Sequence, residues 1–510
     1  MRELLVLSKT RRARLPLIAL ALLTAAPAVA QQAPQVTTAD YDRAVQFLPW
    51  NTSPLVLHGA VRANWLPDGR FWYRDDTERG TEFVLVDPAR GTRTSAFDQA
   101  KLAAALSTAA DTAYREYDLP LRDLEFREHG EIIVTVGRNQ YRCDAAISHC
   151  TRIDAPGAER GEVLSPDGTK AVFIRDWNLW VRDVDTGRET QLTTDGVEDF
   201  GYATDNAGWT HSDRAVVLWS PDSKKVATFQ QDQRGVGEMY LVRTQVGHPT
   251  LQAWKYPLPG DSIVTMIQRV VIDVDDPKVV RFQMPPDQHR STYCDDIACE
   301  GPLSDTQWSP DGSKVAFVSS TRDHKTATLR VADARTGEVR DVLSETVPTQ
   351  YESGFRQANW HVLWDAGKVI WFSERDNWGH LYLYDLQTGK LLNQITTGSW
   401  PVLQLLNVDE DTGTLYFVAA GREPENPYYK QLYSVKLDGS GMKLLTPEPG
   451  DHTVSLSPDG RFFVDSYSTP QKPPVTVLRN AAGTVVMTLA RADVSRLLAT
   501  GWQPPQTIVV

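Results

Sequence analysis

The sequence of 510 residues contains only four cysteines, and it has no excess of glycine or proline, with 33 and 31. Near-average use of both residues excludes collagen-like and linker-dominated chains. After about residue 30 no segment is apolar enough to cross a bilayer as a helix. Basic residues are also in deficit, since the formal net charge is -12, and an acidic chain repels nucleic-acid phosphates. The composition favours a compact globular protein that binds neither nucleic acid nor membrane.

The first thirty residues differ from the rest. A basic stretch ends at Arg14, an apolar run follows from Leu15 to about Ala26, and Ala28-Val29-Ala30 precedes Gln31. This pattern is typical of a secretory signal peptide with its cleavage site. The apolar run is also shorter than the roughly 20 residues of a membrane-spanning helix. We therefore predict that residues 1–30 are a signal peptide and that the mature chain is periplasmic or secreted, by either the general or the twin-arginine route.

The four cysteines form two local pairs, Cys143 with Cys150 and Cys294 with Cys299. An exported protein meets an oxidising compartment, so two short-loop disulfides are the simplest interpretation. A zinc site is the alternative at the first pair, because His149 adjoins Cys150. No Cys-x-x-Cys or His-x-x-x-His spacing accompanies it, and we predict no metal and no cofactor.

A turn motif recurs along the chain. Tetrads close to Ser-Pro-Asp-Gly, each followed by a short apolar run, occur at residues 66–69, 165–168, 220–223, 309–312 and 457–460. Proline presets the first dihedral of such a turn and glycine accepts a positive φ. Alternating segments such as 314–318 and 225–229 follow and are expected to be strands. The spacings lie close to multiples of about 50 residues, the period of a propeller blade.

A second motif, Asp-x-x-Thr-Gly, ends the strands predicted in 179–193, 329–339 and 381–391. The predicted fold class is all-β, an eight-bladed β-propeller with about four antiparallel strands per blade. Tryptophans lie in or next to the predicted strands and are interpreted as packing between blades: Trp65, Trp219, Trp308 and Trp371. Residues 97–113 are rich in helix formers and predict a helical excursion.

Three separated stretches, 207–232, 372–385 (FSERDNWGHLYLYD) and 457–476 (SPDGRFFVDSYSTPQKPPVT), are similar to the propeller of dipeptidyl peptidase IV, within the prolyl oligopeptidase family of serine peptidases. The resemblance covers nearly all of the mature chain. It implies that the propeller caps an α/β-hydrolase domain and that peptides bind in the cavity between the two. By this resemblance, residues 31–54 pack on a hydrolase domain, 55–495 form the propeller, and 496–510 are the truncated start of the hydrolase region.

No catalytic residue is predicted. A nucleophile elbow needs Gly-x-Ser-x-Gly, and the nearest segment, Gly260-Asp261-Ser262-Ile263-Val264, lacks the second glycine. His380, His211 and His361 have no partner pattern and are interpreted as structural histidines. We expect the chain alone to be inactive.

The resemblance also locates a substrate-binding segment. In the family, a segment of the form Asp-Trp-Val-Tyr-Glu-Glu grips the free α-ammonium of the substrate with paired carboxylates. The matching residues 205–213 keep a tryptophan but lack the glutamate pair. The candidate substrate-binding residues are Asp205, Trp209 and Asp213, and Glu198-Asp199 just upstream is interpreted as a surface turn.

The predicted function is therefore that of the propeller of an exported dipeptidyl peptidase IV-like serine peptidase, which gates and binds peptide substrates. The expected partners are peptides and a hydrolase domain in cis or in trans, and a homodimer is kept as a candidate assembly. A second hypothesis is a stand-alone periplasmic propeller that acts as a protein- or peptide-binding module, because one fold hosts many functions.

Overall fold

The computed structural model describes residues 36–508 except 154–160, 205–212, 289–302, 304, 353–358, 425 and 507. The chain divides into two compact units, residues 1–53 and 54–510. The predicted signal peptide lies outside the described residues, and so do Cys294 and Cys299. Within the described ranges no helix is long and apolar enough to span a membrane.

The first unit contains two short helices, α1 (Thr38–Val45) and α2 (Pro49–Thr52). Asp40 Oδ2 accepts hydrogen bonds from Thr37 N at 2.9 Å and from Thr37 Oγ1 at 2.8 Å, which fixes the start of α1. Neither helix contains a buried residue. Large apolar side chains stay exposed, with Tyr41 at 66% and Trp50 at 67%.

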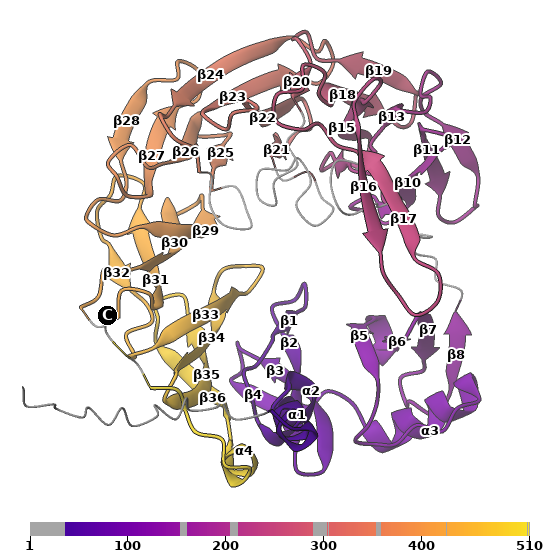
Figure 1. The fold of residues 1–510 in the computed structure, drawn as a ribbon, viewed down its shortest axis with the longest axis vertical. Helices are drawn as coiled ribbons and strands as arrows, with labels where there is room; N and C mark the ends of the chain where they lie inside the picture. Colours follow the sequence, from indigo (N-terminus) through magenta and orange to yellow (C-terminus); the bar gives the residue numbers. More distant parts are fainter. Residues whose placement is uncertain are drawn as a thin grey trace, which may run out of the picture. The chain divides into compact units, whose positions relative to one another are not determined.

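The second unit is an eight-bladed β-propeller, and a one-turn helix, η1 (Ser53–Leu55), lies at its start. Figure 1 shows the blades in chain order around a ring, with the first strands β21, β25 and β29 nearest its centre. Blade 1 contains β1 (Asn64–Trp65), β2 (Phe71–Thr77), β3 (Gly80–Asp87) and β4 (Thr92–Ser95). Blade 2 contains β5 (Leu121–Phe126), β6 (Ile132–Val136), β7 (Asn139–Cys143) and β8 (Cys150–Ile153), with η2 (Glu128–Gly130) between its first two strands. Blade 3 contains β9 (Val163–Leu164), β10 (Lys170–Arg175), β11 (Asn178–Asp183) and β12 (Glu189–Gln191).

Blade 4 is the most elaborate sheet. Its six strands are β13 (Phe200–Tyr202), β14 (Leu218–Trp219), β15 (Lys225–Asp232), β18 (Met266–Asp273), β19 (Lys278–Arg281) and β20 (Asp287–Gln288). Between β15 and β18 the chain forms a separate two-stranded hairpin of β16 (Glu238–Arg243) and β17 (Thr250–Lys255).

Blades 5 to 8 return to four strands each. Blade 5 contains β21 (Thr306–Trp308), β22 (Lys314–Ser320), β23 (Thr326–Asp333) and β24 (Val339–Thr346). Blade 6 contains β25 (His361–Leu363), β26 (Lys368–Ser373), β27 (His380–Asp385) and β28 (Leu391–Gln394). Blade 7 contains β29 (Val402–Asp409), β30 (Thr414–Ala420), β31 (Lys430–Lys436) and β32 (Lys443–Leu444). Blade 8 contains β33 (Asp451–Leu456), β34 (Phe462–Thr469), β35 (Lys472–Asn480) and β36 (Val485–Arg491), and α4 (Ser495–Ala499) follows.

The Ser-Pro-Asp-Gly tetrads form the turns between first and second strands, as predicted. In blade 5, Gly312 N donates to Ser309 O at 2.9 Å, and Gly312 has a φ of 64°. Asp311 Oδ1 accepts from Ser309 Oγ at 2.6 Å and from Ser313 N at 3.0 Å. The carboxylate thus holds both ends of the turn, which explains why aspartate recurs at this position.

Tryptophan side chains join neighbouring blades, which confirms their interpretation as packing residues. The indole N–H of Trp219 donates to Val163 O of blade 3 at 3.1 Å, and that of Trp308 donates to Leu218 O of blade 4 at 3.0 Å. Trp371 of blade 6 reaches Glu345 of blade 5 at 2.9 Å. Each indole therefore buries an apolar ring and satisfies its donor on the preceding blade.

The ring closes between blades 8 and 1 without a shared sheet. Trp65 Nε1 donates to Ser455 Oγ at 3.0 Å, and Leu57 and Asp493 exchange backbone hydrogen bonds of 2.9 and 2.8 Å. Apolar side chains of both blades form one buried cluster that includes Phe71, Tyr73, Val464, Leu478 and Leu489. Residues 499–508 add no strand to blade 8 within the part of the chain that is described.

Helix α3 (Gln99–Ala110) is the predicted helical excursion between blades 1 and 2. Asp98 caps it by accepting from Lys101 N at 3.1 Å, and Leu102 and Leu106 are fully buried against both blades. The predicted disulfide between Cys143 and Cys150 is present and joins directly opposed residues of β7 and β8.

Blade 8 contains a buried charge network. Asp465 Oδ1 lies 2.7 Å from His452 Nδ1, and Asp465 Oδ2 accepts from Arg479 Nε at 2.9 Å. His452 Nε2 lies 2.8 Å from Glu448 O, and Arg479 also bonds the Glu448 carboxylate. Both ring nitrogens of His452 thus face oxygen atoms of the same blade.

Replacing Asp465 should be strongly destabilising, because it leaves Arg479 and His452 buried beside fewer acceptors. We expect Asp465→Ala to lower the free energy of unfolding by about 3–5 kcal/mol, measured by urea denaturation. Arg461→Ala, which removes an exposed ion pair with Asp459, is the control and should change it by less than about 1 kcal/mol. Equal effects of the two variants would contradict the role of the buried network.

The turn carboxylates predict sensitivity to acid. Hydrogen bonds from Ser165 and from the backbone of Thr169 lower the pKa of Asp167 from 3.8 to about 2, and bonds from Ser309 and Ser313 do the same for Asp311. A depressed folded-state pKa adds stability above pH 3.8 that is lost as the pH falls toward 2. The thermal unfolding midpoint should therefore decrease as the pH is lowered from 4 to 2. The decrease should be less steep in an Asp167→Asn, Asp311→Asn double variant. An unchanged slope in the double variant would contradict this assignment.

Candidate functional site

The predicted substrate-binding segment interrupts the first strand of blade 4. β13 ends at Tyr202, β14 begins at Leu218, and both pair with β15. The described residues between these two strands are 203–204 and 213–217. Asp205 and Trp209 lie outside the described residues, as does His211, whereas Asp213 is described and exposed. Asp213 thus lies on the connection between β13 and β14, outside both strands.

The upstream pair Glu198-Asp199 lies in an exposed turn, as expected. Glu198 is exposed, and Asp199 has a φ of 60°. Asp199 lies 3.4 Å from Lys255 Nζ, which is also 3.7 Å from Glu238. Lys255 thus links Asp199 to the base of the β16–β17 hairpin.

A strained turn of blade 3 packs on the same strand of blade 4. Asp176 and Trp177 connect β10 to β11 with φ values of 49° and 60°. Such a conformation costs an ordinary residue roughly 1–2 kcal/mol. Trp177 O accepts from Tyr202 N at 2.9 Å, and the Trp177 side chain is 39% exposed. The turn is therefore hydrogen-bonded to the last residue of β13.

Three glutamines lie at the end of β15, opposite this turn: Gln230, Gln231 and Gln233. All are buried, with exposed fractions of 1%, 0% and 3%. Gln231 Oε1 accepts from Thr204 Oγ1 at 2.8 Å and from Gln233 Nε2 at 3.0 Å. Gln231 Nε2, Gln233 Oε1 and both amide atoms of Gln230 have no hydrogen-bond partner among the described residues.

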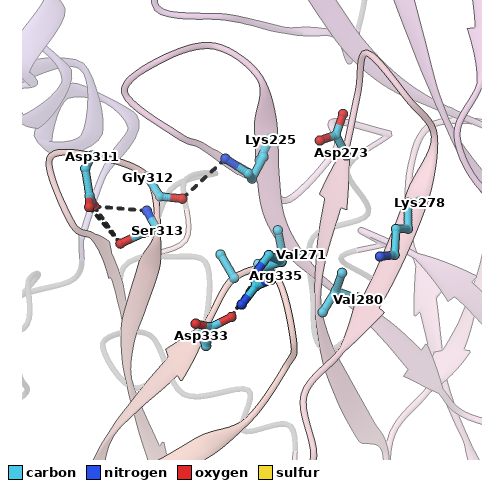
Figure 2. A pocket seen from close by; sticks show the side chains of 11 residues that line it. Lys225, Val271, Asp273, Lys278, Val280, Asp311, Gly312, Ser313, Asp333 and Arg335 are labelled. Carbon is cyan, nitrogen blue, oxygen red and sulfur yellow. Dashed lines mark hydrogen bonds between the residues drawn. The ribbon is translucent and has the colours of Figure 1, made fainter.

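A cleft of about 430 Å³ lies between blades 4 and 5 (Figure 2). Three cationic side chains line it, Lys225, Lys278 and Arg335, together with the carboxylates of Asp273, Asp311 and Asp333. The carboxylates accept hydrogen bonds within their own turns, as Asp333 does from Thr336 N at 2.8 Å. The three positive and three negative side chains give the lining no net charge. The cleft therefore does not attract ligands of one sign of charge over the other.

A second cleft, of about 410 Å³, lies between blades 7 and 8 and is acidic. It is lined by Asp409, Glu410, Asp411 and Asp459. Glu410 faces His361 at 3.1 Å and Asp459 pairs with Arg461. Across the described ranges no cluster of three or more histidine, cysteine, aspartate or glutamate side chains could hold a metal ion.

His380 is a structural histidine. It is 1% exposed, its Nδ1 lies 3.0 Å from Thr396 Oγ1, and its Nε2 lies 3.0 Å from Gly398 O. Burial lowers the pKa of His380, which favours the neutral ring. The bonds describe a ring that donates to Gly398 and accepts from Thr396, with no serine hydroxyl in the pair. His361 is likewise occupied by Glu410.

Sequence reasoning missed Trp177 and the glutamines. Two signals were present in the sequence. Asp176-Trp177 stands where a two-residue hairpin favours Asn-Gly, and three glutamines cluster at residues 230–233, at and just after the end of a predicted strand. The sequence does not show that Trp177 of blade 3 and the glutamines of blade 4 lie close together in the fold.

Comparison with known proteins agrees with this geometry. Residues 137–474 match the family model of the dipeptidyl peptidase IV (DPP IV) N-terminal region. The chain is 25% identical over 339 residues to the "probable dipeptidyl-aminopeptidase B" of Aspergillus oryzae, which covers 61% of this chain and 36% of that protein. It is 27% identical over 371 residues to the Penicillium rubens protein of the same name, covering 65% and 38%. The chain thus spans just over a third of the length of these relatives.

A solved structure supports the fold. Porphyromonas gingivalis dipeptidyl peptidase 4 superposes with a TM-score of 0.59 at 18% identity, covering 86% of this chain and 60% of that one. The protein is an eight-bladed β-propeller. It belongs to the family of dipeptidyl peptidase IV N-terminal regions.

Proposed function

We propose that this chain is the propeller of an exported dipeptidyl peptidase IV-like serine peptidase, which admits and binds peptides for a hydrolase domain supplied in cis or in trans. The family match over residues 137–474 is the observation that carries the proposal. The relatives are named as dipeptidyl-aminopeptidases, and their remaining length leaves room for a catalytic domain. The signal-like N-terminus and the Cys143–Cys150 disulfide support export to an oxidising compartment.

The path of the backbone supports a domain on one face of the ring. Strands of a blade alternate in direction, so the Ser-Pro-Asp-Gly turns lie on one face and the connections between blades on the other. Leu57 precedes β1 and Asp493 follows β36, and the two residues are paired, so both ends of the ring lie on the face with the connections. In the first unit, exposed Tyr41 and Trp50 offer apolar surface that packing on a hydrolase domain would bury.

A stand-alone binding module is the second candidate. The fold supports this candidate, because each of the eight blades forms from one continuous stretch of this chain and needs no strand from another domain. Peptidase activity restored by a separate hydrolase domain would favour the first function, whereas peptide binding that stays without activity when such a domain is added would favour the second.

The purified chain should bind short peptides without cleaving them. We expect no turnover of Xaa-Pro or Xaa-Ala chromogenic dipeptides and no labelling by a serine-directed probe. Asp213→Asn should weaken binding of a tetrapeptide with a free α-ammonium by about two- to fivefold, because an exposed ion pair contributes up to about 1 kcal/mol. Isothermal titration calorimetry measures the affinity.

Two controls belong to this experiment. An N-acetylated tetrapeptide lacks the positive charge, so Asp213→Asn should not change its affinity, and Asp185→Asn should leave both peptides unaffected. Turnover or labelling by the chain alone would contradict its assignment as a non-catalytic region. Absence of peptide binding would contradict the binding role.

We further propose a homodimer that uses the β16–β17 hairpin. Tyr240, Val242 and Leu251 are 61%, 59% and 64% exposed, and Val242 lies directly opposite Leu251. In the described chain neither strand of the hairpin pairs with a further strand. Unpaired edges and an apolar face are features that a second copy would cover.

Val242→Lys should convert such a dimer into a monomer, because it places a charge at the centre of the apolar face. Multi-angle light scattering measures the mass. Val485→Lys, at an exposed position of blade 8, should leave the dimer intact. A monomeric wild-type protein, or a dimer that tolerates Val242→Lys, would exclude this interface.

A further inference from the structure

The turn at Asp176-Trp177 contains residue types that its backbone conformation disfavours. Two-residue hairpins with positive φ at both positions favour Asn-Gly, since glycine has no Cβ to strain. Here the second position carries the largest side chain, with a φ of 60°. A bulky residue kept in such a conformation points to a role for its side chain.

The indole lies against the first strand of blade 4. A Cβ built on Gly201 would stand 3.1 Å from Trp177 Cδ1 and 2.9 Å from Thr204 Cγ2, so this side of Gly201 is covered by both residues. A Cβ on Gly196 would lie 2.2 Å from Trp177 O, so glycine is required there as well. Trp177 remains 39% exposed despite this close packing. Part of an aromatic surface is therefore left uncovered in the structure.

Buried amides share the same side of the sheet. Gln231 is the direct cross-strand partner of Gly201, so its side chain projects to the side on which Trp177 and Thr204 cover Gly201. The bonds from Thr204 and Gln233 occupy Gln231 Oε1. One donor, Gln231 Nε2, and one acceptor, Gln233 Oε1, are left without a partner among the described residues. Buried polar atoms are rarely left unpaired in native proteins, so these two point to a ligand.

We propose that Trp177, Gln231 and Gln233 form a recognition site for a peptide segment. A peptide group offers one C=O acceptor and one N–H donor, which match the unpaired donor of Gln231 and the unpaired acceptor of Gln233. The exposed part of the indole packs on the adjacent apolar side chain of the peptide. Thr204 is the side chain that binding displaces, since its hydroxyl is hydrogen-bonded to Gln231 and its methyl group lies beside Trp177 over Gly201. This inference rests on the proposed peptide-binding function and assigns residues to it.

Trp177→Gly tests the proposal, because glycine relieves the turn while removing the indole. We expect the unfolding midpoint to stay equal or rise, and the affinity for the peptide Ala-Phe-Ala-Ala to fall by about fivefold to tenfold. Calorimetry measures binding, and thermal denaturation measures stability. The matched control is Trp378→Ala, which removes an indole of similar exposure, 37%, from the corresponding turn of blade 6. It should leave the affinity unchanged.

A second measurement isolates the amides. Backbone N-methylation of the peptide removes one N–H at a time, and methylation of the group that faces Gln233 should weaken binding to the wild type. The same methylation should have no further effect on Gln233→Met, which lacks the acceptor. If the wild type binds peptide but Trp177→Gly and Gln233→Met bind equally well, this site is excluded while the proposed function stands. If the wild type binds no peptide, both fail.

Discussion

The ring depends on the contact by which a tryptophan of one blade donates its indole N–H to the blade before it. Trp219 and Trp308 make this contact in the middle of the chain, and Trp65 makes it from blade 1 to blade 8. Closure thus repeats an interaction that already operates between consecutive blades. Because no strand is exchanged, the joint relies on side chains, on the Leu57–Asp493 pair and on the apolar cluster of the two terminal blades. Radial closure of this kind leaves only short strand edges exposed.

The turns form a second system around the ring. In the four tetrads that begin with serine, the aspartate accepts a hydrogen bond from that serine, and in blades 3 and 4 a lysine also reaches the turn of the next blade. Lys170 Nζ lies 3.4 Å from Ser223 O, and Lys225 Nζ lies 3.4 Å from Gly312 O. The motif therefore fixes these turns locally, and the two lysines tie the turns of blades 4 and 5 to the blade before each.

Blade 4 departs from the regular pattern at several points at once. Its first strand is split, a hairpin of exposed apolar residues extends from it, and its second strand ends in buried glutamines with unpaired amide atoms. The strained Asp176-Trp177 turn of blade 3 packs on the same strand. Strained backbone and unpaired buried amides thus occur together at this strand, and it is the part of the propeller in which we place binding.

The sequence by itself determined the architecture, because turn chemistry and strand alternation are local and repeat about every 50 residues. Tetrads such as Ser309–Gly312, the helix near residues 99–110 and the Cys143–Cys150 pair could all be read from neighbouring residues. Only the tertiary structure decided which distant residues meet. Trp177 and Gln231 lie on different blades, and His452, Asp465 and Arg479 on successive strands of one blade become a buried network only through strand register. Register and blade packing depend on contacts between residues far apart in the chain, and these leave no local pattern.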